Sequence, residues 1–468
     1  MEELVAWVKS HGATLHPSVE VYNDPSTGNS FRVSDDGAGI SPGETIVTCP
    51  LGLTLSCLNA TTTPSPGFHH DDTTSSSSTF PPSFLETVPP HVISRFFLIQ
   101  QYLLGKRSFW YPYIRTLPQP EHLQSWILPP LWPSDDIELL EDTNIHVAIS
   151  EIKSRLKSEF KHAIAAFAEA PARHDYTRLL YNWAYCIFTS RSFRPSLVIP
   201  AQIQDTLSLP QGCAIDDFSL LLPLFDVGNH SPKARISWDS DAATNICSLR
   251  TLDTYGPGNQ VFNNYGTTKT NAELMIAYGF RIPESETLHN DYIHVKPRSA
   301  ASSADVDTGP AKPRDFLVSL RPAIDPSSVA VRSMQMLPDI DVTGVFPMFR
   351  YVQDSMVWDL VLAHTTAEQR EKLLPVPEGV DAGNADLARL HMVLDARIPK
   401  DFSPILSQII GIIQHKAILE LERLEQSDFE LEESEATRNQ LMAYEYRGQC
   451  RKILINVLQS LELPEGSE

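Results

Sequence analysis

Two stretches near the middle of the chain decide its fold: residues 222–231, LPLFDVGNHS, and residues 261–280, VFNNYGTTKTNAELMIAYGF. The first follows a strand-like run at 218–222 and passes into a polar turn at 226–231, and the second continues a strand at 260–262 into the polar run at 263–266. In the second stretch, Thr270 and Glu273 have the spacing of a helix N-terminal capping box, and Gly279 suits a helix end. The pattern predicts strand, turn, strand and helix over residues 217–280.

The first 58 residues favour a short helix around Trp7, followed by strands. Residues 45–48 (TIVT) are the clearest β-branched run among them. Residues 36–39 (DGAG) carry two glycines separated by one residue, which lets a ligand approach the backbone closely. The third glycine of a dinucleotide fingerprint is missing, so on its own this segment indicates a plain turn.

Helices are expected at residues 92–104, 149–167 and 177–188, because apolar residues recur there at steps of three or four. Residues 61–82 are of low complexity and predict a disordered loop. This loop contains HHDD at 69–72, a possible metal site. Solvated polypeptide is the better reading, since the run has no helical spacing. We therefore predict no metal.

Residues 297–314 are rich in Ser, Ala and Pro and predict a linker. Beyond it, the regions around 315–335, 353–374 and 402–461 are mostly helical in pattern.

The composition fits a folded protein, with 468 residues of which 42% are hydrophobic. No stretch approaches the length of a membrane span, and residues 1–4 (MEEL) do not resemble a signal peptide. We therefore expect a cytoplasmic or nuclear monomer without a membrane partner. The net charge of −21 disfavours nucleic-acid binding and is compatible with a basic protein partner. The 6 cysteines form no CxxC pair, which favours reduced thiols.

Taken together, the motifs resemble those of the SET-domain methyltransferases, and more narrowly the branch typified by the plant Rubisco lysine methyltransferase. Their order along the chain is that of the family. The motifs are a GxG turn at 37–39, SFWYPYIRTLP at 108–118, LWPSDDIELL at 131–140, SRSF at 190–193, DVGNHS at 226–231, YG at 265–266 and YGF at 278–280.

The resemblance implies an α+β protein. It consists of a β-rich SET domain with small sheets and a knotted-like core, a helical insertion and an all-α C-terminal domain. The corresponding divisions are an N-terminal SET portion (1–60), the low-complexity loop (61–82), the insertion (83–195), a SET portion with the active site (196–296), the linker (297–314) and a helical substrate-binding domain (315–468).

The resemblance also implies the cofactor S-adenosylmethionine and a role for each matching residue. Tyr265 is the catalytic candidate. The implied cofactor-binding residues are Asp36, Gly37, Ala38, Asn229, His230 and Tyr265. The implied substrate-binding residues, around a channel for the target lysine, are Arg191, Asp226, Tyr278 and Phe280. Pro195 stands where the Rubisco-directed enzyme has a second substrate-contacting arginine, which puts the substrate's identity in doubt.

The chemistry suits these residue types. A lysine amine has a pKa near ~10.4 and is mostly protonated at neutral pH. A narrow aromatic channel desolvates the ammonium and favours the neutral, nucleophilic amine. Tyr265 is expected to align the reactants, because a normal tyrosine pKa of ~10 makes a poor general base. His230 is expected to contribute packing and backbone contacts rather than act as a base.

The leading hypothesis is a protein-lysine N-methyltransferase acting on a non-histone protein, with basic ribosomal or translation proteins as first candidates. One alternative is a protein-histidine N-methyltransferase, because neutral imidazole is nucleophilic without desolvation. The other is a catalytically silent protein-binding module.

Overall fold

The structure is a computed structural model. It describes residues 1–61, 65–70, 80–122, 128–167, 171–207, 209, 212–295, 316–322, 325, 349–376, 378–394, 397–432 and 434–461. The predicted linker at 297–314 and most of the low-complexity loop lie outside the described residues. His69 and His70 of that loop are described, and the His69 ring stacks on Phe109 with 3.8 Å between ring centroids.

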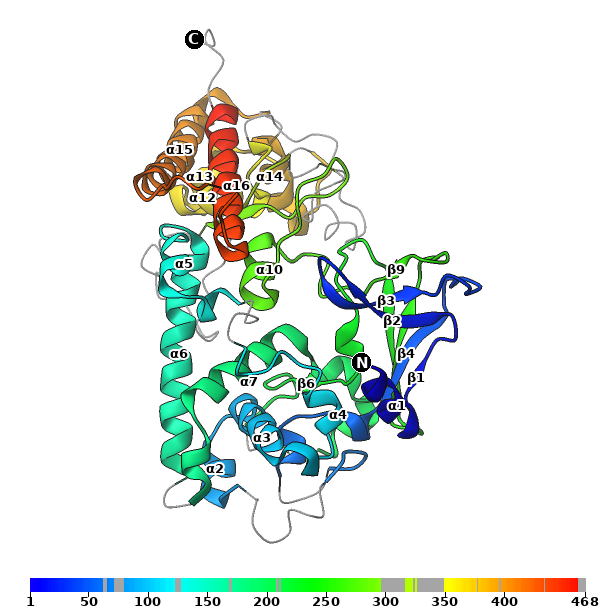
Figure 1. Cartoon of the computed structure of the whole chain (residues 1–468). Helices are drawn as coiled ribbons and strands as arrows, with labels where there is room; N and C mark the ends of the chain where they lie inside the picture. Colours follow the sequence, from blue (N-terminus) through cyan, green and yellow to red (C-terminus); the bar gives the residue numbers. More distant parts are fainter. Residues whose placement is uncertain are drawn as a thin grey trace. The chain divides into compact units, whose positions relative to one another are not determined.

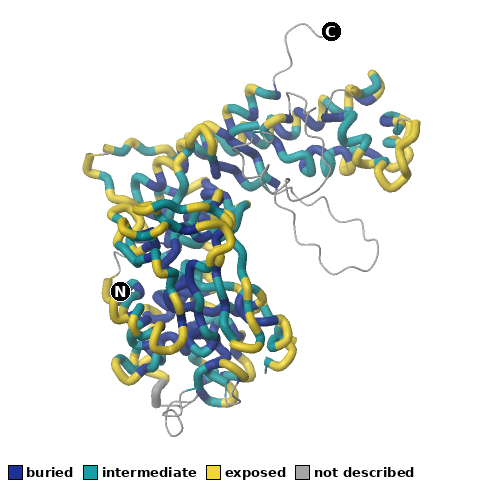
Figure 2. Tube along the Cα trace, turned by 90° about the vertical axis from the view of Figure 1, so that its right-hand side faces the viewer, coloured by how far each residue is buried: buried dark blue, intermediate teal, exposed yellow. Residues whose placement is uncertain are grey.

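The chain forms two compact units (Figure 1). Unit 1 comprises residues 1–131, 151–267 and 277–279, and unit 2 comprises residues 132–150, 268–276 and 280–468. Each unit has its own buried apolar core, and the buried residues run through the inside of both (Figure 2). The domain boundaries predicted from the sequence cut the chain at other positions and remain predictions.

Unit 1 combines small antiparallel sheets with helices. Its sheets have the strand orders β1-β4-β8-β7, β2-β3-β9 and β5-β6. The strands are β1 (Thr14–Leu15), β2 (Val19–Asp24), β3 (Gly28–Val33), β4 (Thr45–Pro50), β5 (Ser192–Phe193), β6 (Leu220–Leu221), β7 (Ile236–Asp241), β8 (Ile246–Thr251) and β9 (Gln260–Val261). The helices that lie wholly in unit 1 are α1 (Glu2–Ser10), α2 (Pro82–Thr87), α3 (Pro90–Leu104), α4 (Tyr111–Ile114), α7 (Arg178–Arg191), α8 (Pro195–Val198) and α9 (Ala201–Gln204).

Unit 2 is mostly helical and carries one two-stranded sheet. Its strands are β10 (Tyr292–Val295) and β11 (Phe316–Ser319), and its helices are α5 (Ser134–Glu138), α12 (Asp354–His364), α13 (Ala367–Leu373), α14 (Ala385–Leu394), α15 (Ser403–Gln426) and α16 (Arg438–Ser460). The helices α6 (Asn144–Ala166) and α10 (Asn271–Tyr278) each contribute residues to both units. The predicted α+β fold is confirmed.

The predicted end of α3 and the predicted starts of α7 and α10 are confirmed, whereas α7 continues beyond residue 188 to Arg191 and α6 begins at Asn144, before the predicted start at 149. α3 begins with proline at its first position and ends at Gly105, whose φ is 55°. The N-terminal cap of α7 is Thr177, whose side chain accepts from Leu180 N–H. Before α10, the Thr270 N–H donates to Glu273 Oε2 at 2.7 Å and the Glu273 N–H donates to Thr270 Oγ1 at 3.3 Å. This is the capping box expected from the sequence.

One local expectation was wrong. The region around 315–335 was predicted to be helical, but its first described residues form β11, which pairs with β10. Residues 316–319 (FLVS) are mostly apolar, and three of the four are buried. Periodicity cannot distinguish so short an apolar run in a strand from one in a helix.

An ion-pair network, mostly buried apart from His91, joins three helices of unit 1. The carboxylate of Glu159 on α6 lies 2.6 Å from Arg95 Nη1 and 3.1 Å from His91 Nε2, both on α3. It also accepts from the Tyr181 hydroxyl of α7 at 2.8 Å. Burial disfavours the ionised carboxyl, but the His91 hydrogen bond and the charge of Arg95 outweigh it and lower the pKa of Glu159 to about 2.

Glu159→Gln is therefore expected to destabilise unit 1 by about 3 kcal/mol at neutral pH. Because the folded-state pKa is lowered, this stabilisation is present above the unfolded pKa of about 4.5 and is lost as pH falls toward 2. Urea unfolding between pH 7 and pH 3 measures it. Glu151→Gln, on the exposed face of the same helix, is the control. An equal loss of stability at pH 7 and pH 3 would contradict the assignment.

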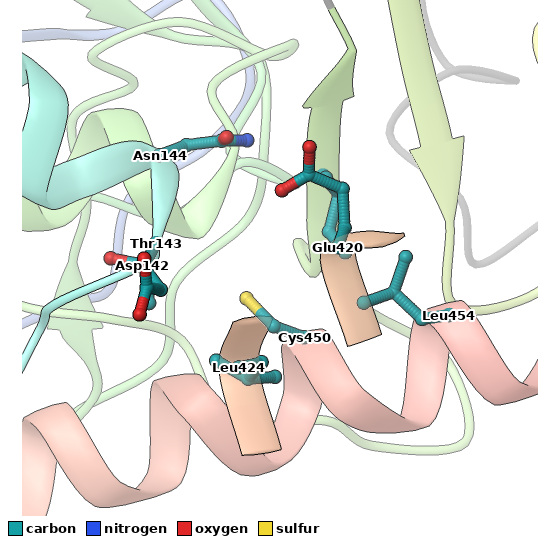
Figure 3. Close-up of a pocket in the computed structure, with 8 residues that line it drawn as sticks. Asp142, Thr143, Asn144, Glu420, Leu424, Cys450 and Leu454 are labelled. Carbon is teal, nitrogen blue, oxygen red and sulfur yellow. The ribbon is translucent and has the colours of Figure 1, made fainter. Parts of the chain in front are cut away.

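A small pocket lies within unit 2 (Figure 3). It is lined by Asp142, Thr143, Asn144, Ile293, Glu420, Leu424, Cys450 and Leu454. Its space holds about one water molecule. Burial raises the pKa of the Cys450 thiol to about 12, which makes that thiol unreactive. None of the site residues predicted from the sequence lines this pocket.

None of the helices in the described part of the chain is long and apolar enough to cross a membrane. Within the same residues, no group of three or more His, Cys, Asp or Glu side chains could hold a metal ion.

Candidate active site

Residues 222–231 and residues 261–280 are joined in space. The Asn263 N–H donates to the Asn229 carbonyl at 2.8 Å, and the Ser231 N–H donates to the Asn263 carbonyl at 2.9 Å. His230 and Asn263 thus form a parallel bridge. This crossing brings the polar turn after β6 beside the polar turn after β9.

His230 is held directly against Tyr265. The Tyr265 N–H donates to His230 Nδ1 at 3.0 Å, and the two rings stack with centroids 5.0 Å apart. Since Nδ1 accepts a hydrogen bond, the neutral ring carries its proton on Nε2. The Nδ1 lone pair is engaged by the backbone and cannot serve as a general base. This geometry supports the packing role expected for His230.

The hydroxyl of Tyr265 points back to the same turn. It donates to the Gly228 carbonyl at 2.9 Å, and the Tyr265 ring lies 4.7 Å from the Tyr278 ring at the end of α10. Burial raises the pKa of Tyr265 well above the ordinary tyrosine value, while the charge of Arg191 acts in the opposite direction. The hydroxyl therefore stays protonated at neutral pH, which favours a role in alignment over one as a base.

The buried Asp226 and the partly exposed Arg191 form an ion pair beside this aromatic stack. The Arg191 Nη1 lies 3.2 Å from Asp226 Oδ2 and donates to the Asp226 carbonyl at 3.3 Å. The Asp226 side chain is only 2% exposed. Burial raises the pKa of the Asp226 carboxyl, while Arg191 and a hydrogen bond from Tyr113 offset part of that rise.

The backbone before Asp226 is unusual. Leu224 is fully buried and has a φ of 76°, a left-handed conformation that costs a leucine about 1–3 kcal/mol. The chain reverses here from β6 into the short 3₁₀ turn Phe225–Val227. Strain of this kind persists only where the surrounding packing holds it, and here it sets the direction of the turn that carries Asp226.

The segment after the GxG turn is hydrogen-bonded to the segment that precedes β9, the strand that leads to Tyr265. Ile40 and Tyr255 exchange backbone hydrogen bonds of 2.8 and 3.0 Å. Gly39 has a φ of 85°, and a Cβ at this position would lie 3.0 Å from the Tyr255 carbonyl. Only glycine fits both constraints. Asp36 and Ala38 are exposed on this turn.

Within unit 1, the structure brings together Arg191, Asp226, Asn229, His230, Tyr265 and Tyr278. The turn with Asp36, Gly37 and Ala38 belongs to the same unit and follows β3 in the chain. Phe280 is half-buried and belongs to unit 2.

Sequence reasoning missed three contributors to this site. Gly228 supplies the carbonyl that Tyr265 meets. Thr27, at the tip of the β2–β3 hairpin, accepts from Asn229 Nδ2 at 2.8 Å and donates to Asp24 at 3.0 Å. Tyr113 of α4 donates to Asp226 Oδ2 at 3.0 Å. Tyr113 lies inside a quoted motif, but nothing in the spacing links it to Asp226, which is 113 residues away in the chain.

Solved structures share this architecture. The SET domain of LSMT bound to lysine and AdoHcy matches 98% of this chain and 90% of its own, with a TM-score of 0.62 at 16% identity. The Rubisco LSMT bound to AdoMet matches 98% of this chain and 91% of its own, with a TM-score of 0.60 at 17% identity. The chain has the SET-domain fold. Its fold is that of the Rubisco lysine methyltransferase-like branch.

Curated relatives of this SET-domain protein match at the sequence level. The ribosomal lysine N-methyltransferase set10 of Schizosaccharomyces pombe is 28% identical over 318 residues, which cover 65% of this chain and 51% of the relative. The protein-lysine N-methyltransferase EFM1 of Saccharomyces cerevisiae is 21% identical over 325 residues, which cover 60% of this chain and 49% of the relative.

The human actin-histidine N-methyltransferase is 27% identical over a shorter span of 204 residues, which cover 42% of this chain and 30% of the relative. The matched region thus spans about half the length of the first two relatives and less of the third. No family model matches the chain.

Proposed function

We propose that this SET-domain protein is an S-adenosylmethionine-dependent protein-lysine N-methyltransferase acting on a non-histone protein. The observation that carries the proposal is the hydrogen bond from the Tyr265 N–H to His230 Nδ1. It joins the two turns that the resemblance assigns to cofactor binding and to catalysis. The names of the relatives set10 and EFM1 support lysine as the acceptor.

The residues present suit a sulfonium cofactor. His230, Tyr265 and Tyr278 form a continuous stack of rings, and aromatic faces attract cations. Asn229 adds a side-chain amide beside this stack, and the turn at Asp36–Ala38 offers exposed polar backbone. When bound, S-adenosylmethionine supplies an electrophilic methyl group on a positively charged sulfur.

The chain's own residues have three tasks. The aromatic walls desolvate the ammonium group of the incoming lysine. This favours loss of one proton to solvent, which leaves the neutral amine. The protonated Tyr265 hydroxyl is fixed on the Gly228 carbonyl, so its oxygen and ring would help to align the lysine amine with the methyl group of a bound cofactor. Asp226, buried against Arg191, supplies negative charge near the place where a cationic side chain enters.

Thr27 is expected to support cofactor binding, because its hydroxyl fixes the Asn229 amide. Thr27→Val should weaken S-adenosylmethionine affinity by about three- to tenfold, the worth of one hydrogen bond. Isothermal titration calorimetry measures this change. Thr14→Val, which loses a hydrogen bond to Thr48 across β1 and β4, is the matched control and should bind normally. If Thr27→Val bound S-adenosylmethionine with unchanged affinity, Thr27 would have no role in cofactor binding.

The proposal is tested in two steps. Calorimetry should first detect S-adenosylmethionine binding by the full chain. Incubation with tritiated S-adenosylmethionine and an extract of the source organism should then label a protein band. Cofactor binding without any labelled product would favour the silent protein-binding module instead.

The substrate and the location of the protein extend this proposal. The net charge of −21 supports a basic protein as substrate, such as a ribosomal or translation protein. We further propose that the helical C-terminal region docks this substrate, and that the protein works in the cytoplasm or nucleus as a monomer.

A further inference from the structure

We propose that Tyr113 is a positioning residue of the active site, which orients the Asp226 carboxylate for an incoming cationic side chain. This inference rests on the proposed function for its catalytic consequence. The contact itself stands on the geometry of unit 1. In the sequence, Tyr113 is part of the motif SFWYPYIRTLP at 108–118, and no functional role was predicted for it.

The position of Tyr113 is held by packing that does not involve Asp226. It is fully buried on the short helix α4, next to Trp110, whose Nε1 donates to the Leu53 carbonyl at 3.0 Å. After α4, the Pro118 carbonyl accepts from Trp183 Nε1 at 2.6 Å. Two buried indoles therefore lock the segment around α4 onto the rest of unit 1, and the Tyr113 hydroxyl has little freedom.

The Tyr113 hydroxyl and Arg191 share one oxygen of Asp226. Tyr113 donates to Oδ2 at 3.0 Å and Arg191 Nη1 approaches the same oxygen at 3.2 Å. The other oxygen, Oδ1, is buried and makes no hydrogen bond to the described residues. A buried carboxylate oxygen without a donor is costly, and a substrate ammonium or amine that donates to Oδ1 would satisfy it.

The groups around Asp226 determine how strongly the Tyr113 hydrogen bond affects the pKa of its carboxyl. The titratable groups around the carboxylate are Arg191 on α7, Tyr113 on α4, Tyr265 after β9 and Cys49 on β4, while β3 presents the apolar Phe31 to this turn. Burial raises the pKa of Tyr113 well above its ordinary value, so its hydroxyl remains a donor throughout the working pH range. Arg191 and Tyr113 thus each lower the pKa of the Asp226 carboxyl against the larger rise that burial causes.

Tyr113→Phe removes one hydroxyl and keeps the ring. It is expected to lower kcat/KM for the protein substrate about tenfold, the loss of one hydrogen bond to a charged group. It should also move the acidic limb of the pH profile of kcat/KM to higher pH, because Asp226 then takes up its proton more readily. S-adenosylmethionine affinity should stay within about twofold of wild type, since Asp226 is assigned to the substrate.

A second readout does not depend on activity. The folded-state pKa of Asp226 is raised above the unfolded value, so its ionisation costs stability as pH rises through that range. Tyr113→Phe should raise that pKa further, so the gap in unfolding stability between variant and wild type should widen with rising pH and then level off. Tyr111→Phe, on the same helix under Arg115, should show a gap that does not vary with pH.

Combining Tyr113→Phe with Asp226→Asn completes the test. If Tyr113 acts through Asp226, the Tyr113→Phe change should have little further effect once Asp226 is asparagine. An equal loss in both backgrounds, or an unmoved acidic limb with a pH-independent stability gap, would overturn the proposal. Failure of the wild type to transfer methyl groups would overturn the proposed function but leave the stability readout intact.

Discussion

Replacing Tyr265 by phenylalanine is expected to lower the rate of methyl transfer at least about 100-fold while S-adenosylmethionine still binds. The hydroxyl that is lost donates to the Gly228 carbonyl at 2.9 Å, inside the turn between Asp226 and Asn229. Without it, the hydroxyl oxygen that we propose to lie near the reacting methyl group is gone, and the ring loses the hydrogen bond to Gly228. The Tyr265 N–H bond to His230 and the ring stack remain, so the cofactor site should persist.

Single-turnover labelling and calorimetry on the same preparation measure the two effects separately. Tyr102→Phe is the matched control, because it also loses one tyrosine hydroxyl bond, to Glu121, but lies on α3 outside the site. Turnover of Tyr265→Phe close to wild type would sink the assignment of Tyr265. A parallel loss of cofactor binding would instead make Tyr265 a cofactor-binding residue first.

The second large effect is expected in unit 2, where Arg447→Met should destabilise the unit by about 3–5 kcal/mol. Arg447 is 2% exposed on α16. Its guanidinium donates to the Glu141 and Leu424 carbonyls, each at 2.6 Å, and to Ser427 Oγ at 3.0 Å. Methionine fills a similar volume but removes the guanidinium donor from these three oxygens, of which the Leu424 carbonyl belongs to a buried residue. One of them belongs to the last turn of α15, whose carbonyls have no helical partner.

Hydrogen exchange read at the peptides of α15 and α16 isolates this unit. Arg451→Met, one turn further along α16, breaks only the partly exposed ion pair with Asp428 and should cost less than about 1 kcal/mol. Equal protection losses in the two variants would show that Arg447 is not the residue that joins α16 to the segment after α5.

Much of the fold could be predicted from local sequence. The capping box at Thr270 and Glu273, the glycine after α3 and the β-branched run in β4 each depend on neighbours in the chain, and each lies where it was expected. The apolar face of α6 was also found from its period. The division of this helix between the two units was not predicted. Ile149 packs in the core of unit 2, and Leu156 packs in the core of unit 1. Periodicity shows that a face is buried but not against which partner.

In the candidate site, too, some residues were predicted from the sequence and others were found only in the structure. The resemblance supplied the positions of Asn229, His230 and Tyr265, which lie close to one another in the structure. The partners that set their chemistry, Thr27 for Asn229 and Tyr113 for Asp226, are separated from them by 202 and 113 residues. Such contacts follow from the folded path of the backbone, including the left-handed Leu224. No spacing rule in the sequence encodes them.

The central claim is that the turn at Asn229–His230 and Tyr265 together transfer a methyl group to a protein lysine. The most direct measurement is peptide mass spectrometry of an extract protein methylated by the full chain, with Tyr265→Phe run in parallel. We expect a mass increase of one or more methyl groups on a lysine side chain, present with wild type and absent with the variant. A methyl group on histidine, or the same lysine product from Tyr265→Phe, would contradict it.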